Sequence, residues 1–352
     1  MSKPTILLTG AQGWLGKRLV KIILGKSHGN PILDTAITDD TTVRCLILPG
    51  QDEKELTSLS PRVECVTGDI RNYADCEAFT KGAEGAVVIH IAGIIHPSKV
   101  SEFYSINRDG AANILKAAVQ NKLRRAVVMS SNSPCGCNPF RDHLFDESSP
   151  YHPYMNYGQS KKEMEEIVQQ YTREGKIETV VIRAPWFYGP DQPDRQILFF
   201  SMIKEGKGPI VGDGNNLRSM AYLDNLSQGL LLAAFQPHAA GETYWIADEK
   251  PYRMNEIIDT IESLMENEFS IKVAHKRLKL PGLAAEVAEI VDSVLQKAGV
   301  YNQKIHVLGE MNKTIACSID KAKSHLGYKP LFSLQEGMRR SLQSVFDNGQ
   351  KI

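Results

Sequence analysis

Short apolar runs alternate with helical patterns through the first half of the chain. Runs rich in β-branched residues predict strands over 5–9, 42–48, 62–67, 86–91, 126–130 and 179–182. Between them, apolar residues at helical spacing predict helices over 14–24, 102–121 and 157–173. Such alternation implies right-handed βαβ crossovers, so we expect an α/β fold built on a Rossmann-type, doubly wound parallel sheet.

This alternation stops after Arg183, where Pro185, Gly189, Pro190 and Pro193 mark an irregular segment. Beyond it, the pattern predicts helices over 196–205, 224–235, 254–267, 283–295 and 334–346 and one more strand over 243–247. We therefore expect a Rossmann domain over residues 1–185 and a smaller, mostly C-terminal α/β lobe over 186–352. Roughly residues 219–247 are expected to return to the Rossmann domain.

Composition narrows the class of protein. The chain has 352 residues with 41 Lys+Arg and 41 Asp+Glu, so its formal net charge is zero. A neutral chain lacks the positive surface that holds nucleic-acid phosphates, so no nucleic acid is expected as a partner. The longest apolar stretch, residues 86–95, is too short to cross a bilayer, and no membrane span is predicted.

The six cysteines indicate a reducing compartment. Cys45 and Cys65 lie in strand-like runs and are interpreted as free thiols, because a chain of this length can build a core without disulfides. The first residues run directly into a predicted strand rather than a secretory signal, so we expect a cytoplasmic location. Cys135 and Cys137 have no second pair at metal-ligand spacing, and no metal site is predicted.

A glycine-rich turn follows the first predicted strand and opens a helix. It reads Gly10-Ala-Gln-Gly13-Trp14-Leu15-Gly16. Glycines allow a tight turn and the close approach of a diphosphate, while the amides at the helix start face the anion. We therefore predict a dinucleotide site, although the spacing is three and three rather than the usual two and three. The alternative is a turn that serves only helix–strand packing.

Tyr157 and Lys161 stand four residues apart in a predicted helix and so share one face. A tyrosine of ordinary pKa, ~10, needs a drop of roughly 3 units, or about 4 kcal/mol, to act as a base at neutral pH. A lysine ~5 Å away supplies about 3 kcal/mol at an effective dielectric constant of ~20. The pair therefore predicts an acid–base tyrosine, with an oxidised nicotinamide supplying the remainder.

Two serines follow the predicted strand over 126–130. A hydroxyl at the carboxyl end of a parallel strand points into the crevice where such sheets bind ligands. Ser131 is expected to hydrogen-bond the substrate oxygen on which Tyr157 acts, and Ser133 stays open as the working serine. The alternative is a serine that only ends the strand in a turn.

From TGAQGWLG to LGYKPLFSLQEGM the chain resembles the extended short-chain dehydrogenases/reductases, and among them the NAD-dependent epimerase/dehydratase family. The resemblance implies Ser131, Tyr157 and Lys161 as catalytic residues. It also implies that Asn107 kinks its helix and supports the lysine. The implied cofactor-binding residues are Gly10, Gly13, Trp14, Leu15, Gly16, Asp69, Ile70, Ala92, Gly93, Tyr157, Lys161 and Pro185.

Fewer sequence features indicate which residues bind the substrate. Arg218 resembles the arginine with which the family holds a substrate diphosphate, and a guanidinium suits that role because it forks onto phosphate oxygens. The alternative is a surface ion pair with a nearby aspartate. His96 is expected near the same crevice, either as a substrate contact or as a structural hydrogen-bonding residue, and Ser133 is a third candidate substrate contact.

The second predicted strand departs from the NAD pattern. It ends at Leu48-Pro49 without the carboxylate that binds the adenosine ribose in NAD-preferring relatives. Arg44, Lys17 and Arg18 offer partners for a 2′-phosphate. The cofactor is therefore expected to be NAD or NADP, with a slight lean towards NADP.

The two residues after Ser131 differ from those of the family's 4,6-dehydratases, which reduces the number of reactions to consider. The 4,6-dehydratases of this family carry Asp-Glu where this chain has Asn132 and Ser133, neither of which does that acid–base work. Epimerisation or simple oxidoreduction remains. We therefore expect an epimerase or oxidoreductase acting on a hydroxyl or keto group of a nucleotide-activated sugar, in a homodimer formed through the helices over 102–121 and 157–173.

The C-terminal part of the sequence indicates an alternative function. The stretch LKLPGLAAEVAEIVDSVL is similar to the tail of the 3β-hydroxysteroid dehydrogenase-like branch, which implies an oxidoreductase acting on a hydrophobic alcohol. One helical face gathers Leu283, Val287, Ile290, Val291 and Val294. That face predicts a packing helix, a lid over a hydrophobic substrate, or a helix at a membrane surface. A third possibility is a regulator that senses NAD(P) without catalysis, which needs the glycine turn but neither Tyr157 nor Lys161.

Overall fold

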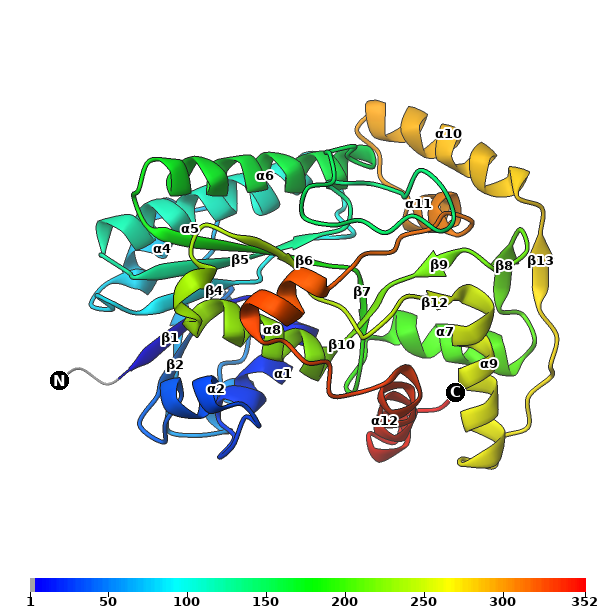
Figure 1. The fold of residues 1–352 in the computed structure, drawn as a ribbon, viewed down its shortest axis with the longest axis horizontal. Coiled ribbons are helices and arrows are strands. Elements are labelled where there is room, and N and C mark those ends of the chain that lie inside the picture. The colour runs from blue at the N-terminus through cyan, green and yellow to red at the C-terminus, as the bar shows by residue number, and fades with distance from the viewer. Residues whose placement is uncertain (1–3) are drawn as a thin grey trace.

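The protein is described from a computed structural model over residues 4–352. Seven parallel strands form one sheet in the order β11-β6-β5-β4-β1-β2-β3 (Figure 1). Their bounds are β1 Thr5–Thr9, β2 Thr42–Ile47, β3 Val63–Thr67, β4 Val87–His90, β5 Arg125–Ser131, β6 Glu178–Ala184 and β11 Thr243–Trp245. The strand order reverses between β1 and β4, and ligands bind sheets of this kind at the carboxyl ends beside such a reversal.

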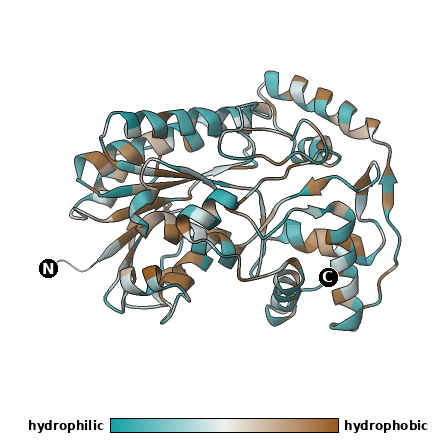
Figure 2. Cartoon of the chain, in the orientation of Figure 1, coloured by the Kyte–Doolittle hydropathy of each residue, from teal (hydrophilic) through white to brown (hydrophobic). Residues whose placement is uncertain are grey.

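Helices cover both faces of the sheet. Alternate strand residues pack on one side against α1 (Trp14–Ile23), α2 (Pro31–Ala36), α3 (Lys54–Thr57) and α8 (Leu223–Phe235). The others pack against α4 (Tyr73–Thr80), α5 (Asp109–Gln120) and α6 (Met155–Arg173). The strands are correspondingly apolar along much of their length (Figure 2).

A third core is formed by residues from the second half of the chain. It gathers apolar side chains of α7 (Asp194–Lys204), α9 (Met254–Asn267) and α12 (Leu334–Asp347). Three pairs of short strands frame it: β7 (Trp186–Tyr188) with β10 (Met220–Tyr222), β8 (Pro209–Val211) with β13 (Leu278–Leu280), and β9 (Leu217–Arg218) with β12 (Tyr252–Arg253). Two further helices, α10 (Leu283–Lys297) and α11 (Gln303–Glu310), form a hairpin at the edge of the molecule (Figure 1).

The predicted Rossmann-type α/β fold is confirmed. Each of the seven predicted strands has a counterpart in the sheet, including the last, β11, which pairs with β6. The helix predicted over 102–121 is a π-helical turn, Phe103–Arg108, followed by α5. The sequence patterns missed α2, α3, α4 and α11, the short strands β7, β8, β9, β10, β12 and β13, and the turns Pro237–Ala239 and Ala322–Leu326.

Two findings bear on metals and membranes. Within residues 4–352, no three His, Cys, Asp or Glu side chains gather as metal ligands would. Over the same residues, no helix has both the length and the apolar character that crossing a bilayer requires.

Candidate functional site

The glycine turn fits tightly between β1 and β4. Gly10 has a positive φ of 73°, and a β-carbon there would lie 2.8 Å from the Ala92 nitrogen. A β-carbon on Gly16 would lie only 2.1 Å from the Gly10 oxygen, whereas one on Gly13 would lie 3.2 Å from it. No side chain caps the start of α1, so its first amides are available to an anion.

Trp14 and Leu15 point away from that turn. The Trp14 indole donates a hydrogen bond to the Pro190 carbonyl at 2.6 Å, and its ring lies 5.6 Å from that of Phe187. Leu15 is buried in the core. These two residues therefore offer a diphosphate their backbone amides rather than their side chains.

Asp69 and Ile70, the predicted adenosine contacts, follow β3 at the edge of the sheet. Asp69 accepts two hydrogen bonds from the Arg71 Nε, at 2.9 and 3.1 Å, and this bonding lowers the pKa of its carboxyl. Ile70 is buried against Gly110, where a β-carbon would lie 2.6 Å from its Cδ1. Gln12 donates to the Asp52 carbonyl at 2.7 Å and so joins the loop after β2 to the glycine turn.

The basic side chains considered for a 2′-phosphate all have carboxylate partners. Arg18 forks onto Asp224 at 2.5 and 2.6 Å, and Lys17 pairs with Glu55. Arg44 pairs with Glu64 at 3.4 Å and also donates to two carbonyls beside α4. The slight lean towards NADP therefore finds no support in these contacts.

Lys161 is buried in the middle of the site. Its ammonium donates to the Met129 carbonyl at 2.9 Å, and burial lowers the lysine pKa to about 8, against the opposing charge of Glu165. A β-carbon on Gly93 would lie 3.6 Å from this ammonium and 3.1 Å from Asn107 Oδ1. The backbone at Gly93 therefore passes directly over the lysine.

Asn107 acts on the loop rather than on the lysine. Its Oδ1 accepts from the Ile94 amide at 2.8 Å, and its Nδ2 donates to the Ile94 carbonyl at 3.1 Å and to Ser160 Oγ at 3.3 Å. It lies in the π-helical turn, as the family resemblance implied, but its side chain reaches Lys161 only through Gly93 and Ser160.

Tyr157 is half-buried beside Ser131. Burial raises the phenol pKa to about 12, the Ser131 hydroxyl opposes that rise, and the Glu310 charge adds to it. The Tyr157–Lys161 pair alone predicts a lowered pKa. Burial raises it instead, and the Lys161 ammonium donates to the Met129 carbonyl.

The two serines share one turn. The Ser133 amide donates to Ser131 Oγ at 3.3 Å, which is the turn contact weighed as the alternative to a catalytic serine. Ser131 Oγ also lies 3.4 Å from Ser133 Oγ. Ser131 is the serine whose hydroxyl affects the Tyr157 pKa. Pro185, the last of the implied cofactor contacts, is buried between β6 and β7.

His96 pairs with a residue that the sequence patterns missed. Its Nδ1 lies 2.7 Å from the Tyr301 hydroxyl, and the two rings stack at 5.9 Å. Burial, with the nearby Arg195 and His306, lowers the His96 pKa to about 4. Tyr301 meets Phe103 edge-on at 5.5 Å, and Phe103 lies 5.7 Å from Tyr157. These rings connect His96 to the phenol of Tyr157.

Arg218 has the Glu310 carbonyl as its partner, to which Nη2 donates, and burial lowers its pKa. The weighed alternative, an ion pair with a nearby aspartate, does not form, since Asp213 pairs with Arg141 at 2.8 Å. Part of the donor capacity of Arg218 is therefore used inside the protein, and the rest remains for a ligand.

The Glu310 carboxylate lies close enough to Arg218 for its charge to affect the arginine pKa. Its charge contributes to raising the pKa values of Tyr154, Tyr157 and Tyr301, in each case after burial. Among residues 4–352 no hydrogen-bond donor to this carboxylate is found. The buried Tyr154 hydroxyl also lacks a partner within that range. Sequence patterns missed Glu310 because it lies in a short helix far along the chain from Tyr157.

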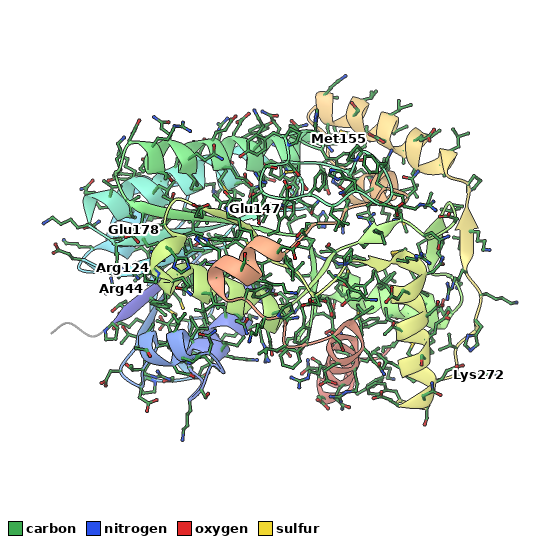
Figure 3. All side chains as sticks on the ribbon, in the orientation of Figure 1. Arg44, Arg124, Glu147, Met155, Glu178 and Lys272 are labelled. Carbon is green, nitrogen blue, oxygen red and sulfur yellow. The ribbon has the colours of Figure 1, made fainter. Side chains whose placement is uncertain are left out.

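The hairpin that carries Tyr301 and Glu310 is fastened to α6. Gln296 Oε1 accepts from the backbone nitrogen of Asn156 at 3.1 Å and from its Nδ2 at 3.0 Å. His306 and Asp292 form a buried pair at 2.7 Å; burial would lower the His306 pKa, but this hydrogen bond and Glu310 raise it. Figure 3 shows Met155, where α6 begins, beside α10.

Comparisons with known proteins agree with this fold. A family model described as "NAD dependent epimerase/dehydratase family" matches residues 6–247. The uncharacterized protein y4nL of Sinorhizobium fredii is 50% identical over 353 residues, covering 100% of this chain and 98% of its own.

Two characterised relatives are more distant. The N-acetyl-alpha-D-glucosaminyl-diphospho-ditrans,octacis-undecaprenol 4-epimerase of Escherichia coli O157:H7 is 25% identical, covering 98% of this chain and 96% of its own. The 3beta-hydroxysteroid-dehydrogenase/decarboxylase isoform 1 of Arabidopsis thaliana is 26% identical, with coverages of 96% and 79%.

A solved structure of DesIV, a dTDP-glucose 4,6-dehydratase from Streptomyces venezuelae with NAD and TYD bound, has a TM-score of 0.73. It is 22% identical and covers 98% of this chain and 97% of its own. At this identity the likeness shows the shared fold alone.

Proposed function

The chain belongs to the NAD-dependent epimerase/dehydratase family, and on that premise we propose that it is an epimerase or oxidoreductase acting on a hydroxyl or keto group of a nucleotide-activated sugar. One observation carries the proposal: the Tyr157 phenol lies beside the Ser131 hydroxyl, and the buried Lys161 ammonium lies beside Gly93, next to a glycine turn that has no room for side chains.

The residues present fit a nicotinamide dinucleotide, because a β-carbon at Gly10 or Gly16 would fill the space beside the turn. The amides at the start of α1 would hold the diphosphate, and Asp69 and Ile70 would contact the adenosine. Ala92, Gly93 and Pro185 would line the nicotinamide. Tyr157 and Lys161 would bind the ribose next to it. Bound NAD would supply a hydride acceptor and a positive charge near the phenol. We propose NAD rather than NADP, since the basic side chains near the turn are already paired.

Tyr157 exchanges a proton with the substrate hydroxyl, and Ser131 holds the same oxygen. A pKa of about 12 leaves the phenol protonated at neutral pH. Bringing it to ~7 requires about 7 kcal/mol, of which an ammonium ~5 Å away supplies about 3 kcal/mol. Lys161 therefore has to exchange its bond to Met129 for a position facing the phenol, and its charge covers part of the requirement only.

The C-terminal lobe supplies the residues that bind the sugar nucleotide. Arg218 contacts a diphosphate with the donors that Glu310 does not use, and His96 with Tyr301 borders the sugar. The Glu310 carboxylate accepts hydrogen bonds from sugar hydroxyls, which is consistent with its lack of a donor in the protein. We propose residues 1–185 with roughly 219–247 as the cofactor domain and the rest of 186–352 as the substrate lobe.

A homodimer and a cytoplasmic location remain proposals. None of the exposed large hydrophobic side chains in the described residues lies in α5 or α6, so a dimer through these helices would have a polar interface.

The decisive experiment is to denature the purified protein and identify any released nicotinamide by mass spectrometry, with Tyr157→Phe as the matched variant. Retained NAD that the substrate does not consume indicates an epimerase, and NAD that must be added indicates a net oxidoreductase. Turnover that survives in Tyr157→Phe would contradict the catalytic assignment of Tyr157. Bound NAD(P) with no turnover in the wild-type chain would favour a non-catalytic regulator.

A second candidate is an oxidoreductase of the 3β-hydroxysteroid dehydrogenase type. The exposed apolar face of α10, close to Tyr301, favours it. Arg218→Ala separates the two candidates: it should weaken sugar-nucleotide binding at least tenfold, whereas unchanged affinity would favour the hydrophobic alcohol.

A further inference from the structure

Exposed apolar side chains concentrate in one short part of the chain. Half of the sixteen large hydrophobic residues that are exposed among those described lie between 278 and 307. Five of them lie on one face of α10, with exposed fractions between 41% and 66%. We call these five the apolar ridge: Leu283, Val287, Ile290, Val291 and Val294.

The helix beneath the ridge is held in place. At 100° per residue the five side chains cover an arc of about 100°. Ala285, Ala288, Asp292 and Gln296 are buried on the opposite arc. Asp292 bonds His306 at 2.7 Å, and Gln296 bonds Asn156 at 3.1 Å. The small and polar side of α10 is therefore packed inwards, and its apolar side is exposed. The helix itself lies at the edge of the molecule (Figure 1).

Positive charge surrounds the ridge. Lys279 precedes α10, Lys297 lies in its last turn, and Lys304 begins the neighbouring α11. Lys99 lies beside Val100, whose amide donates to the Gly299 carbonyl at 3.3 Å. These four lysines are exposed and have no carboxylate partner among residues 4–352. Lys272 lies well away from α10 and is not counted (Figure 3).

Little negative charge offsets these lysines. Of the three acids in α10, Asp292 is buried and Glu289 pairs with Lys313 at 3.0 Å. Glu286 is the remaining exposed acid in this helix. Outside this helix, Glu102 accepts a hydrogen bond from the Lys99 amide at 3.1 Å. Two carboxylates therefore stand against four lysines, and the rim of the ridge keeps a positive balance that complements an anionic surface.

A second copy of the chain fits less well. Five side chains of this size, each about half exposed, present on the order of 500 Å², whereas a stable dimer buries about 800 Å² on each partner. A convex apolar stripe edged with lysines is instead the form of a helix that lies in a lipid–water interface.

We propose that α10 docks the protein on an anionic phospholipid membrane, with the apolar ridge among the upper acyl chains and the four lysines at lipid phosphates. The docked face borders the site, because Tyr301 follows Val300 and bonds His96, and the exposed Ile95 precedes that histidine. This inference rests on α10 and its lysines and does not depend on the proposed reaction.

The test is flotation of the purified full chain with two kinds of vesicle: phosphatidylcholine alone, and phosphatidylcholine with roughly one third phosphatidylglycerol. The wild-type chain should float with the anionic vesicles, and added salt should weaken this binding. Ile290→Glu should reduce binding at least tenfold, since it places a charge where an apolar side chain enters the lipid. Lys279→Gln with Lys297→Gln should reduce binding to anionic vesicles and its dependence on salt.

Leu331→Glu is the matched control. Leu331 is 60% exposed, against 66% for Ile290, and lies outside the 278–307 segment. It should float like the wild type, and circular dichroism should show that both variants fold. Failure of the wild type to bind anionic vesicles, equal binding to both kinds of vesicle, or full binding by Ile290→Glu would overturn the proposal. A dimer in sedimentation that Ile290→Glu abolishes, without vesicle binding, would assign the face to a second copy.

Discussion

The ammonium of Lys161 lies 2.9 Å from the carbonyl oxygen of Met129, the third residue from the end of the strand that finishes with Ser131. Burial lowers the pKa of this lysine to about 8, which still leaves the ammonium protonated at neutral pH. Strand β5 thus provides the acceptor for the ammonium as well as the serine hydroxyl beside the phenol.

Lys161→Met should lower kcat at least a hundredfold. It should also move the acid limb of the pH–rate profile, which deprotonation of the phenol sets, to higher pH, because the charge that favours the phenolate is lost. Lys162→Met is the matched control. Lys162 is the next residue on the same helix and pairs with Glu166 at 3.0 Å, so its loss should leave the profile unchanged. Equal effects of the two changes would assign Lys161 a structural role.

Glu310→Gln should raise KM about tenfold, because a charged acceptor of sugar hydroxyls becomes a neutral one. It should also move the Tyr157 limb of the pH–rate profile to lower pH, since the Glu310 charge raises the phenol pKa. Glu289→Gln is the control, as Glu289 contributes to the raised pKa of Tyr154 and pairs with Lys313. A KM unaffected by Glu310→Gln would remove it from the substrate site.

Gly16→Ala and Gly13→Ala should differ sharply in NAD binding. The first places a β-carbon 2.1 Å from the Gly10 oxygen and forces the turn to move, while the second places one at 3.2 Å. Calorimetry should show cofactor affinity falling at least tenfold for Gly16→Ala and much less for Gly13→Ala. A far-UV spectrum separates a displaced turn from an unfolded chain, and equal affinities would place the diphosphate elsewhere.

His90 should make the protein sensitive to acid. Burial lowers the His90 pKa to about 3 from an ordinary value of 6.5, so between these values the unfolded chain binds the extra proton. The free energy of unfolding should therefore fall as pH drops from about 6.5 towards 3, by at most about 4 kcal/mol from this group. Urea unfolding at pH 5 and 7 should show a smaller loss in His90→Asn than in the wild type. The exposed His152, changed to Asn, should leave the loss unaltered.

Sequence patterns predicted the parts of the molecule that local rules determine. The glycine turn needs only its own residues and the strand before it, and the helix expected over 254–267 has those bounds in the structure because its apolar spacing is regular. Contacts between distant segments carry no such signal. Tyr301 and Glu310 meet Tyr157 only because the α10–α11 hairpin folds back onto α6.

The apolar face of α10 shows where a general rule misleads. An amphipathic helix ordinarily turns its apolar face inwards. Here two alanines, Asp292 and Gln296 occupy the inward side. Asp292 hydrogen-bonds His306, and Gln296 hydrogen-bonds Asn156 and Asp292. The partners of those two side chains lie in other parts of the chain, so the sequence of α10 alone cannot show which side is buried.

The bonds from Gln296 to Asn156 join the outermost helix to the first turn of the helix that carries Tyr157. At 3.0 and 3.1 Å these bonds tolerate little change, and a shift of α10 by an ångström breaks them. If α10 docks on a surface as proposed, these bonds would link the free energy of attachment to that of substrate binding, and linkage acts equally in both directions. Substrate bound at Tyr157 would then raise the affinity of α10 for the membrane surface. The membrane surface would raise the affinity for substrate by the same factor.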